Sequence, residues 1–317
     1  MDKLSIIIPV YFNHDSLMTL YEDIKEKVLS RLDCDYEIIM VDDGSEDNSF
    51  DVICKLSKID NKIIPVRLSR NFGQHAAILA GLSKATGTCA TMKAADLQEP
   101  SEMILDMLDK YRKTKCKVIL AIREERDEAF NRKFFGDAYS LIMKRFILHN
   151  MPRGGFDCFL IDRQVIDILN MMEEKNTSLM GQILWSGFKT EKVYYKRQKR
   201  EIGKSKWTLS KKFKLFFDSI FGFSYLPIKF ISISGGIIFI FAMVWLIYTL
   251  IAKLVGHISV EGYTTIIIIM LLGFGLTMLF LGILGSYIWR MFDAVRNRPP
   301  YIIDDIDLDE YKSRNHL

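Results

Sequence analysis

The sequence predicts an α/β domain with a mainly parallel sheet, followed by two C-terminal transmembrane helices. In residues 1–195, short apolar runs alternate with segments whose apolar residues recur at helical spacing. This alternation is typical of a parallel sheet with helices on both faces. Further on, residues 228–254 and 263–289 are almost uniformly apolar, and each exceeds the length of about 20 residues that crosses a bilayer core. A buried helical hairpin is the disfavoured alternative, because neither run has a polar face.

The elements of the first domain follow from periodicity and from the residues that end each run. Strands are predicted at residues 4–9, 36–41, 62–68, 89–93 and 117–122. Helices are predicted at residues 16–32, 48–57, 74–84 and 102–111. Such a sheet binds its ligands beyond the carboxyl ends of the strands. A dinucleotide-dependent enzyme is disfavoured, because residues 9–14 lack the glycines of a Gly-x-Gly-x-x-Gly turn.

Basic residues flank the two apolar runs. Lysines and arginines crowd residues 196–214 and recur after residue 289, whereas residues 256–262 contain neither. The positive-inside rule therefore places both termini in the cytoplasm. We expect a cytosolic domain at 1–195, a basic amphipathic juxtamembrane segment at 196–227, two membrane helices within 228–289 and a cytoplasmic tail at 290–317. No cleavable signal is expected, since the chain enters an apolar strand at once.

Composition narrows the classes of partner and compartment. The net charge is only +4, and the basic excess lies beside the apolar runs. A nucleic-acid partner is therefore not expected, and anionic lipid headgroups are the simpler partner. The five cysteines have no paired spacing typical of a zinc site or a redox motif. We expect free thiols in a reducing cytosol.

Residues 66–100 contain the strongest chemical signal. Asp96 and Gln98 supply two oxygen ligands where a metal-bound diphosphate would sit. The same stretch has basic side chains that can meet phosphate: Arg67, Arg70 and Lys84. Together they indicate a nucleotide-diphosphate donor.

Two adjacent carboxylates follow the second predicted strand. Asp42 and Asp43 precede Gly44, which makes the turn, and they can accept hydrogen bonds from a base N–H or from ribose hydroxyls. The alternative is a strand-to-helix turn with no ligand.

Several motifs occur in an order that is more specific than any one of them. They are Pro-Val-Tyr at 9–11, Val-Asp-Asp-Gly-Ser at 41–45, Arg-Asn-Phe-Gly-Gln-His at 70–75, Asp-Leu-Gln-Glu-Pro at 96–100, Gly-Lys-Ser-Lys-Trp at 203–207, and the paired apolar runs. The chain resembles the family 2 glycosyltransferases of the GT-A (Rossmann-like) fold. Within them it is most similar to bacterial membrane-anchored polyprenyl-phosphate glycosyltransferases, including the bactoprenol glucosyltransferases and the undecaprenyl-phosphate aminoarabinose transferases.

The resemblance implies a reaction and a location. One sugar would pass from a nucleotide sugar, usually a UDP-sugar, to a polyprenyl phosphate, with inversion at the anomeric carbon. The enzyme would be a multi-pass protein of the bacterial cytoplasmic membrane, with its active site on the cytoplasmic side. Its product would serve cell-envelope glycan or lipid modification. Neither the sugar nor the final glycan follows from residue types.

The resemblance also assigns roles to residues. The nucleotide pocket would comprise Pro9, Tyr11, Asp42, Asp43, Arg70, Ala95 and Asp96. Asp96 and Gln98 match the second acid and the following amide of the family's Asp-x-Asp motif, which implies Mg²⁺ or Mn²⁺. The acceptor phosphate would be bound by Arg197, Arg200, Lys204, Ser205 and Lys206; headgroup attraction without a site is the alternative. Asp96 and Asp157 are the predicted catalytic residues, with Asp157 orienting the acceptor.

The sequence departs from the family pattern at two positions. Ala94 replaces the first acid of Asp-x-Asp, which weakens the predicted metal site and leaves open that Lys93 supplies part of the charge. Phe159 stands where an arginine is often found. His75 is a second candidate base, although a structural hydrogen bond suits its place at the start of a helix equally well.

Two other functions stay open at this point. A processive polysaccharide synthase is disfavoured, because Gln182-Ile183-Leu184-Trp185 lacks the arginine of the Gln-x-x-Arg-Trp motif and two helices cannot enclose a pore. A catalytically weak, membrane-anchored nucleotide-sugar-binding protein is the other, motivated by Ala94. Small residues in the second apolar run, such as Gly282 and Gly285, suit close helix packing and leave a dimer or tetramer open.

Overall fold

The computed structural model describes residues 3–124, 152, 155–156, 158–172, 178–197, 226–254, 262–296 and 298–304. These residues fall into two compact units. The first contains the α/β fold together with the segment that begins at Pro299, and the second contains two long helices.

The α/β unit is built on one sheet whose order is β3-β2-β1-β4-β6-β5-β7 among the described residues. The strands are β1 (Lys3–Val10), β2 (Asp35–Asp42), β3 (Ile63–Arg67), β4 (Cys89–Met92), β5 (Val118–Arg123), β6 (Cys158–Asp162) and β7 (Thr190–Tyr195). All neighbouring pairs are parallel except those that β6 makes with β4 and β5. The prediction of a mainly parallel sheet is confirmed, and β6 and β7 are additions to it.

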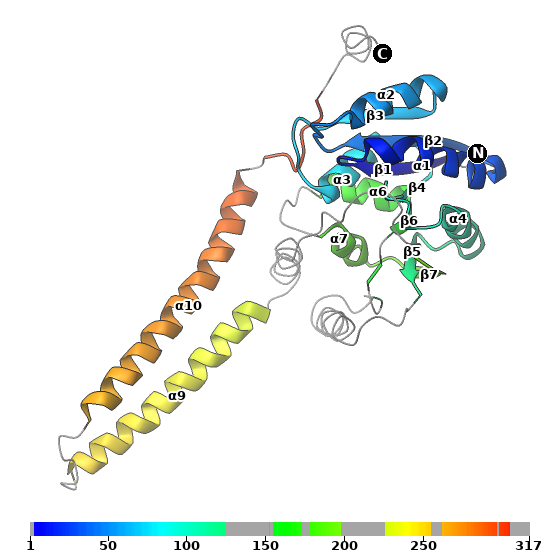
Figure 1. Cartoon of the computed structure of the whole chain (residues 1–317). Helices are drawn as coiled ribbons and strands as arrows, with labels where there is room; N and C mark the ends of the chain where they lie inside the picture. The colour runs from blue at the N-terminus through cyan, green and yellow to red at the C-terminus, as the bar shows by residue number, and fades with distance from the viewer. Residues whose placement is uncertain are drawn as a thin grey trace. The chain divides into compact units, whose positions relative to one another are not determined.

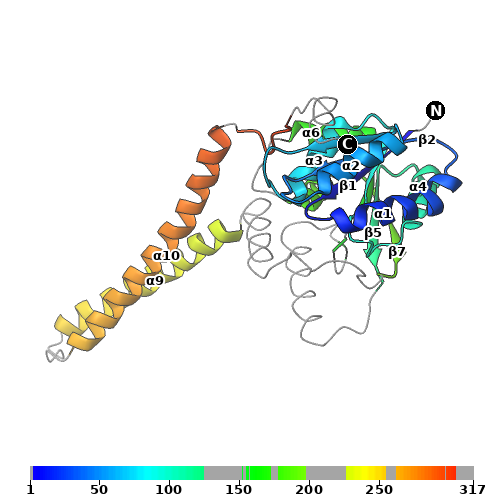
Figure 2. The same ribbon diagram turned by 45° about the horizontal axis from the view of Figure 1, so that its top comes forward.

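The helices of this unit are α1 (His14–Lys27), α2 (Ser49–Ile59), α3 (Gln74–Lys84), α4 (Met103–Thr114), α6 (Arg163–Met171) and α7 (Leu179–Trp185). Helices cover both faces of the sheet, with α1 and α4 on one side and α3 and α6 on the other (Figures 1 and 2). The predicted helix at 16–32 is shorter than expected. It ends at Lys27 and is followed by a separate 3₁₀ turn, Leu29–Arg31.

Side chains of β2 alternate between two apolar clusters. Ile38 and Met40 belong to the large core with α1 and α2, whereas Ile39 and Val41 pack with Ala77 of α3. Successive strand residues point to opposite faces, so a strand covered on both faces needs a continuous apolar run. This explains the uniform Ile-Ile-Met-Val sequence of β2.

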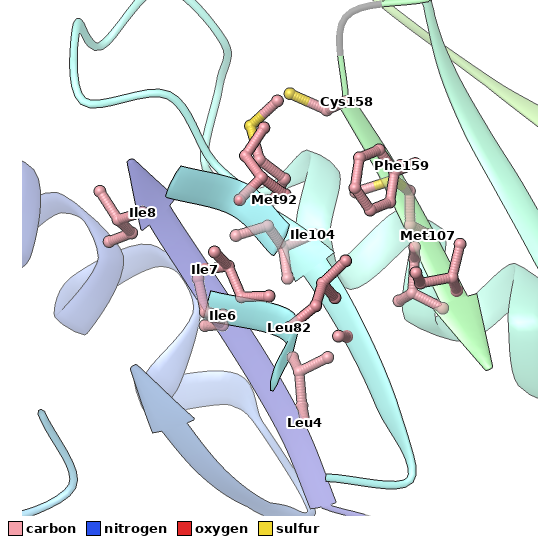
Figure 3. Packing of buried hydrophobic residues seen from close by; sticks show 14 of the residues in the cluster. Leu4, Ile6, Ile7, Ile8, Leu82, Met92, Ile104, Met107, Cys158 and Phe159 are labelled. Carbon is pink, nitrogen blue, oxygen red and sulfur yellow. The ribbon is translucent and has the colours of Figure 1, made fainter. Parts of the chain in front are cut away.

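The large core centres on β1. Figure 3 shows its Leu4, Ile6, Ile7 and Ile8 beside residues from α3, β4, α4 and β6, among them Met92, Met107 and Phe159. Phe159, singled out as a departure from the family pattern, is fully buried in this core. It therefore has a packing role at the centre of β6.

The second unit consists of α9 (Leu226–Leu254) and α10 (Tyr263–Val295), drawn yellow and orange in Figure 1. Both predicted apolar runs are therefore helical. Within α10, the 23 residues Gly273–Val295 have a mean hydropathy of 1.3 and are long and apolar enough to cross a membrane. In α9 the corresponding apolar stretch is the shorter Ile233–Trp245. Large apolar side chains, such as Phe241 and Phe274, are exposed along both helices.

The chain after α10 returns to the α/β unit. Ile303 forms an antiparallel bridge with Leu68, just beyond β3. Two flanking hydrogen bonds extend the pairing, from Ser69 N–H to the carbonyl of Ile302 (3.0 Å) and from Asp304 N–H to the carbonyl of Arg67 (2.8 Å). Residues 290–295 of the predicted tail therefore continue α10, and residues 302–304 form an extra edge segment of the sheet, next to the loop that precedes α3.

Candidate active site at the carboxyl ends of the strands

Parallel pairing brings the carboxyl ends of six strands to one edge of the sheet. Parallel pairs join β1 to β2, β2 to β3 and β1 to β4, so these four strands run in one direction. Because β6 is antiparallel to both β4 and β5, strand β5 runs in that direction too, and β7 is parallel to β5. Residues that follow these strands therefore gather at this edge: Tyr11, Asp43, Arg70, Asp96 and Arg197.

Asp43 fixes the loop between β3 and α3. Its buried carboxylate accepts hydrogen bonds from the backbone N–H of Phe72 (2.7 Å) and of Gly73 (2.9 Å), and from the Asn71 side-chain amide (3.0 Å). Hydrogen bonds to an ionised acceptor are the strong class. The carboxylate that the sequence suggested as a partner for the base is thus engaged in positioning residues 71–73, and its contact with the nucleotide stays a prediction.

Gly44 allows the two loops to touch. Its φ is +65°, and a Cβ at this position would lie 2.4 Å from the carbonyl carbon of Arg70. Any other residue would therefore meet both an unfavourable backbone conformation and a collision with main-chain atoms. The Asp-Asp-Gly turn and the Arg-Asn-Phe-Gly loop consequently form one rigid structure.

Asp42 lies beneath this turn. Its side chain is 0% exposed, both carboxylate oxygens accept from the Ser45 N–H at 3.3 Å, and Arg67 Nε lies 3.7 Å from Oδ2. Burial raises the pKa of Asp42, against the opposing effect of Ser45 and Arg67. Arg67 also stacks over the ring of Phe50, so this arginine is already paired inside the fold.

The turn after β1 presents two aromatic side chains. Tyr11 and Phe12 are partly exposed, and their rings meet edge to face with centroids 4.7 Å apart. Phe12 has a φ of +53°, which is uncommon for a bulky residue. Its N–H donates to Ser45 Oγ at 3.0 Å, a contact that ties this strained turn to the turn after β2. Pro9 is half-buried in β1, opposite Val41.

The acidic tip after β4 contains the predicted metal ligands. Asp96 is half-buried, and its Oδ1 accepts from the Gln98 N–H at 3.2 Å. Gln98 Oε1 in turn accepts from Nη2 of Arg197, which follows β7. Ala95 is buried, and its carbonyl accepts from Ser16 Oγ at 2.9 Å.

Lys93 does not supply charge to this tip. The side chain is fully buried, and Nζ donates to the Glu99 carbonyl and lies 4.0 Å from Glu99 Oε2. The hypothesis that Lys93 compensates for Ala94 is therefore wrong, because its ammonium is paired inside the domain.

The implied divalent ion would need oxygen donors at the tip after β4. In the described ranges, no group of three or more His, Cys, Asp or Glu residues could hold a metal. Asp96 and Gln98 nevertheless provide one carboxylate and one amide oxygen on the same turn. Mg²⁺ typically uses one or two carboxylates and takes its other ligands from phosphates and water. These residues fit an ion that a bound diphosphate helps to hold.

Residues 5–169 match the family model described as glycosyl transferase family 2. The chain belongs to this family. It is a glycosyltransferase with a GT-A type α/β domain, as the sequence motifs predicted.

Its relatives match over nearly the whole chain. An uncharacterized glycosyltransferase of Bacillus subtilis, YkcC, is 34% identical and covers 95% of this chain and 93% of its own length. The undecaprenyl-phosphate 4-deoxy-4-formamido-L-arabinose transferase of Sodalis glossinidius is 32% identical, covering 96% and 93%. The prophage bactoprenol glucosyl transferase homolog of Escherichia coli is 29% identical, covering 95% and 98%. Among solved structures, mannosyl-3-phosphoglycerate synthase of Rubrobacter xylanophilus has a TM-score of 0.46 at 15% identity, covering 68% and 71%.

Not every predicted residue of the glycosyltransferase lies at this edge. Lys84 ends α3 just before Thr88, whose N–H donates to the carbonyl of Lys3 at the start of β1. It therefore lies at the opposite edge of the sheet, and its predicted phosphate contact is wrong. Arg70 does lie at the carboxyl edge, where its guanidinium stacks over Phe72 at 4.1 Å. Predicted residues outside the described ranges are Asp157, Arg200, Lys204, Ser205 and Lys206.

Sequence reasoning missed three contributors to the glycosyltransferase site. Asn71 and Gly73 were seen only as part of a motif, and their joint attachment to Asp43 needs the tertiary fold. Nothing in the sequence marked Phe12 as a site residue, apart from its position next to Tyr11. The glycine of Arg-Asn-Phe-Gly could have been found, since it immediately precedes the predicted helix at 74–84. In the structure its φ is +101°, a conformation that favours glycine.

Proposed function

We propose that this glycosyltransferase transfers one sugar from a nucleotide sugar, most simply a UDP-sugar, to a polyprenyl phosphate, with inversion. The observation that carries the proposal is the extent of the likeness to relatives named as undecaprenyl-phosphate and bactoprenol transferases. It covers 95–96% of this chain and so includes both the α/β unit and the apolar helices. A soluble acceptor would not require the second unit.

The nucleotide sugar is assigned to the carboxyl edge of the sheet. Tyr11 and Phe12 offer aromatic surface to a base, and Asp43 holds the loop that contains Arg70. The proposed pocket retains the residues predicted from sequence: Pro9, Tyr11, Asp42, Asp43, Arg70, Ala95 and Asp96. Asp42 supports this pocket from beneath the turn, because its carboxylate is fully buried.

The chemistry needs positioning more than proton removal. A phosphate acceptor is already an anionic nucleophile at neutral pH, so the site must hold it in line and exclude water. An acceptor oxygen attacks the anomeric carbon opposite the leaving group. A sugar–phosphate bond forms as the bond to the β-phosphate oxygen breaks, and the electron pair leaves with the nucleoside diphosphate. A divalent ion at Asp96 and Gln98 would stabilise the charge that develops there.

The acceptor phosphate is assigned to the basic segment that follows β7. Its members Arg200, Lys204, Ser205 and Lys206 precede the apolar helices in sequence, where a lipid phosphate must arrive. Asp157, immediately before β6, is proposed to orient the acceptor.

Both long helices are proposed to cross the bacterial cytoplasmic membrane, with the termini on the cytoplasmic side. Their lengths of 29 and 33 residues exceed the roughly 20 residues that a bilayer core needs, and residues 256–262 lack lysine and arginine. A cysteine introduced at Ser259 should react with an impermeant thiol reagent in intact cells, and one at Ser313 should not. The reverse pattern would overturn this topology.

The activity is tested by incubating the full-length protein with undecaprenyl phosphate and a panel of radiolabelled nucleotide sugars. One donor should give a labelled lipid and an equal amount of free nucleoside diphosphate. Asp96→Asn should remove most of this product, while Asp109→Asn, on the exposed surface of α4 beside Lys113, should not. Binding of a nucleotide sugar without labelled lipid would show a binding protein instead.

A further inference from the structure

Arg197 and Gln98 come from distant parts of the sequence and meet at the carboxyl edge of the sheet. Nη2 of Arg197 donates to Oε1 of Gln98, across 99 residues of chain. Gln98 follows β4 and Arg197 follows β7, and the strands β6 and β5 lie between these two in the sheet. The guanidinium therefore reaches back across two strand ends to the tip that carries Asp96.

The guanidinium retains a donor that no atom of the described residues accepts. Nε of Arg197 is buried, and within the described part of the chain it has no hydrogen-bond partner. A buried N–H without an acceptor is unfavourable, and arginine offers five such donors in a fixed planar fork. An oxygen-rich ligand placed beside Asp96 would satisfy it.

Two other basic side chains at this edge of the sheet are already paired. Lys93, just after β4, is buried against Glu99, and Arg67, at the end of β3, lies beside Asp42. Ala94 leaves the tip one carboxylate short of the family's Asp-x-Asp motif, so a metal ion would be held by fewer protein charges here. Arginine can compensate, because its fork matches two phosphate oxygens at once.

We propose that Arg197 binds the diphosphate of the nucleotide donor, with Gln98 orienting its guanidinium, and that this contact holds the donor even without a divalent ion. The inference depends on the proposed function only in taking a nucleoside diphosphate as the ligand. It moves Arg197 from the acceptor site, where the sequence placed it, to the donor site.

The test measures UDP and uridine binding to the full-length protein in detergent by calorimetry, with excess chelator. Wild-type protein binds UDP under these conditions. Arg197→Gln lowers the affinity for UDP by on the order of tenfold or more, the loss expected for charge-assisted hydrogen bonds, and leaves the affinity for uridine unchanged. The matched control is Arg112→Gln, since this arginine on α4 pairs with Asp33 at the opposite edge of the sheet; it changes neither affinity.

Arg197→Lys keeps the charge but loses the fork, so its UDP affinity should lie between those of wild type and Arg197→Gln. Full dependence of wild-type UDP binding on a divalent ion would overturn the proposal. So would unchanged UDP affinity in Arg197→Gln together with a higher requirement for undecaprenyl phosphate in the transfer assay, which would return Arg197 to the acceptor. Loss of sugar transfer to lipid with every donor, combined with Arg197-dependent UDP binding, would refute the proposed function and leave this inference standing.

Discussion

The carboxylate of Asp43 accepts a 2.9 Å hydrogen bond from the backbone N–H of Gly73, 30 residues further along the chain. Gly73 immediately precedes α3, so the bond fixes both the entry to this helix and the loop that carries Arg70. The turn after β2 and the loop after β3 therefore act as one wall of the candidate site.

Asp43→Ala should weaken both the fold and nucleotide binding. It removes the acceptor of three hydrogen bonds and leaves the N–H groups of Phe72 and Gly73 without their partner. We expect a loss of about 3 kcal/mol in the free energy of unfolding, measured by denaturation of the α/β unit, with a parallel loss of UDP affinity. Asp43→Asn should lose less, since one oxygen remains. Unchanged stability in Asp43→Ala would show that the loop is held by other contacts.

Gly44→Ala should be more destabilising than a positive φ alone explains. Gly187 is the matched control: its φ is +74°, but the nearest atom to an added Cβ is the Trp185 carbonyl oxygen at 3.9 Å, compared with 2.4 Å to Arg70 at Gly44. Gly187→Ala should therefore cost about 1 kcal/mol for the backbone conformation, and Gly44→Ala clearly more, in thermal unfolding. Equal losses would mean that the loop at Arg70 shifts freely.

Glu37 should contribute to stability in a defined acid window. Burial on its own raises the pKa of this carboxyl, but Lys3, Ser5 and Thr86 outweigh it and lower the pKa to about 2, from an ordinary value of 4.5. Because the folded-state pKa is depressed, the stabilisation is complete above about pH 4.5 and is lost as the pH falls toward about 2. The difference in free energy of unfolding between wild type and Glu37→Gln should be at most roughly 3 kcal/mol at the upper end of this window. It should shrink as the pH falls toward the lower end. A difference independent of pH would contradict the assignment.

Gln182 is the buried side chain whose replacement should stabilise the protein. It is 1% exposed, and neither its amide nitrogen nor its amide oxygen has a hydrogen-bond partner within the described ranges. Gln182→Met keeps the length and removes the unsatisfied polar atoms, so the free energy of unfolding should rise by about 1 kcal/mol. Gln182→Glu should lower it. A stable Gln182→Met variant that fails to transfer sugar would show that the amide contacts a substrate.

Through Ile303, the segment after α10 should stabilise the loop between β3 and α3, which carries Arg70. Ile303 packs against the cluster of Val41, Val66 and Leu68, whereas its neighbour Ile302 is 51% exposed. Ile303→Asp should therefore lower the melting temperature and weaken UDP binding, because it buries a charge beside β3. Ile302→Asp, the matched control, should change neither. Equal effects of the two substitutions would mean that the pairing with Leu68 does not anchor the segment.

Local sequence determined most elements of this protein. The predicted helix at 74–84 coincides with α3, and the predicted strands at 4–9, 36–41 and 62–68 overlap β1, β2 and β3 to within two residues. These strands are specified by short continuous apolar runs and this helix by apolar residues three or four positions apart, which single-sequence patterns record directly. The family motifs placed Tyr11, Asp43, Arg70 and Asp96 at one edge, because they all follow parallel strands.

Only the tertiary structure decided which of these side chains meet. The order β4-β6-β5-β7 inserts a later, antiparallel strand between two earlier ones, and no local pattern specifies that order. Arg197 reaches Gln98 because of this strand order. Ile303 reaches Leu68 because the chain returns to the sheet after α10. The same limit misplaced Lys84, since a residue near the donor motif in sequence lies one helix length away in space. Periodicity encodes which face a residue presents, whereas contacts between loops depend on how the whole sheet is assembled.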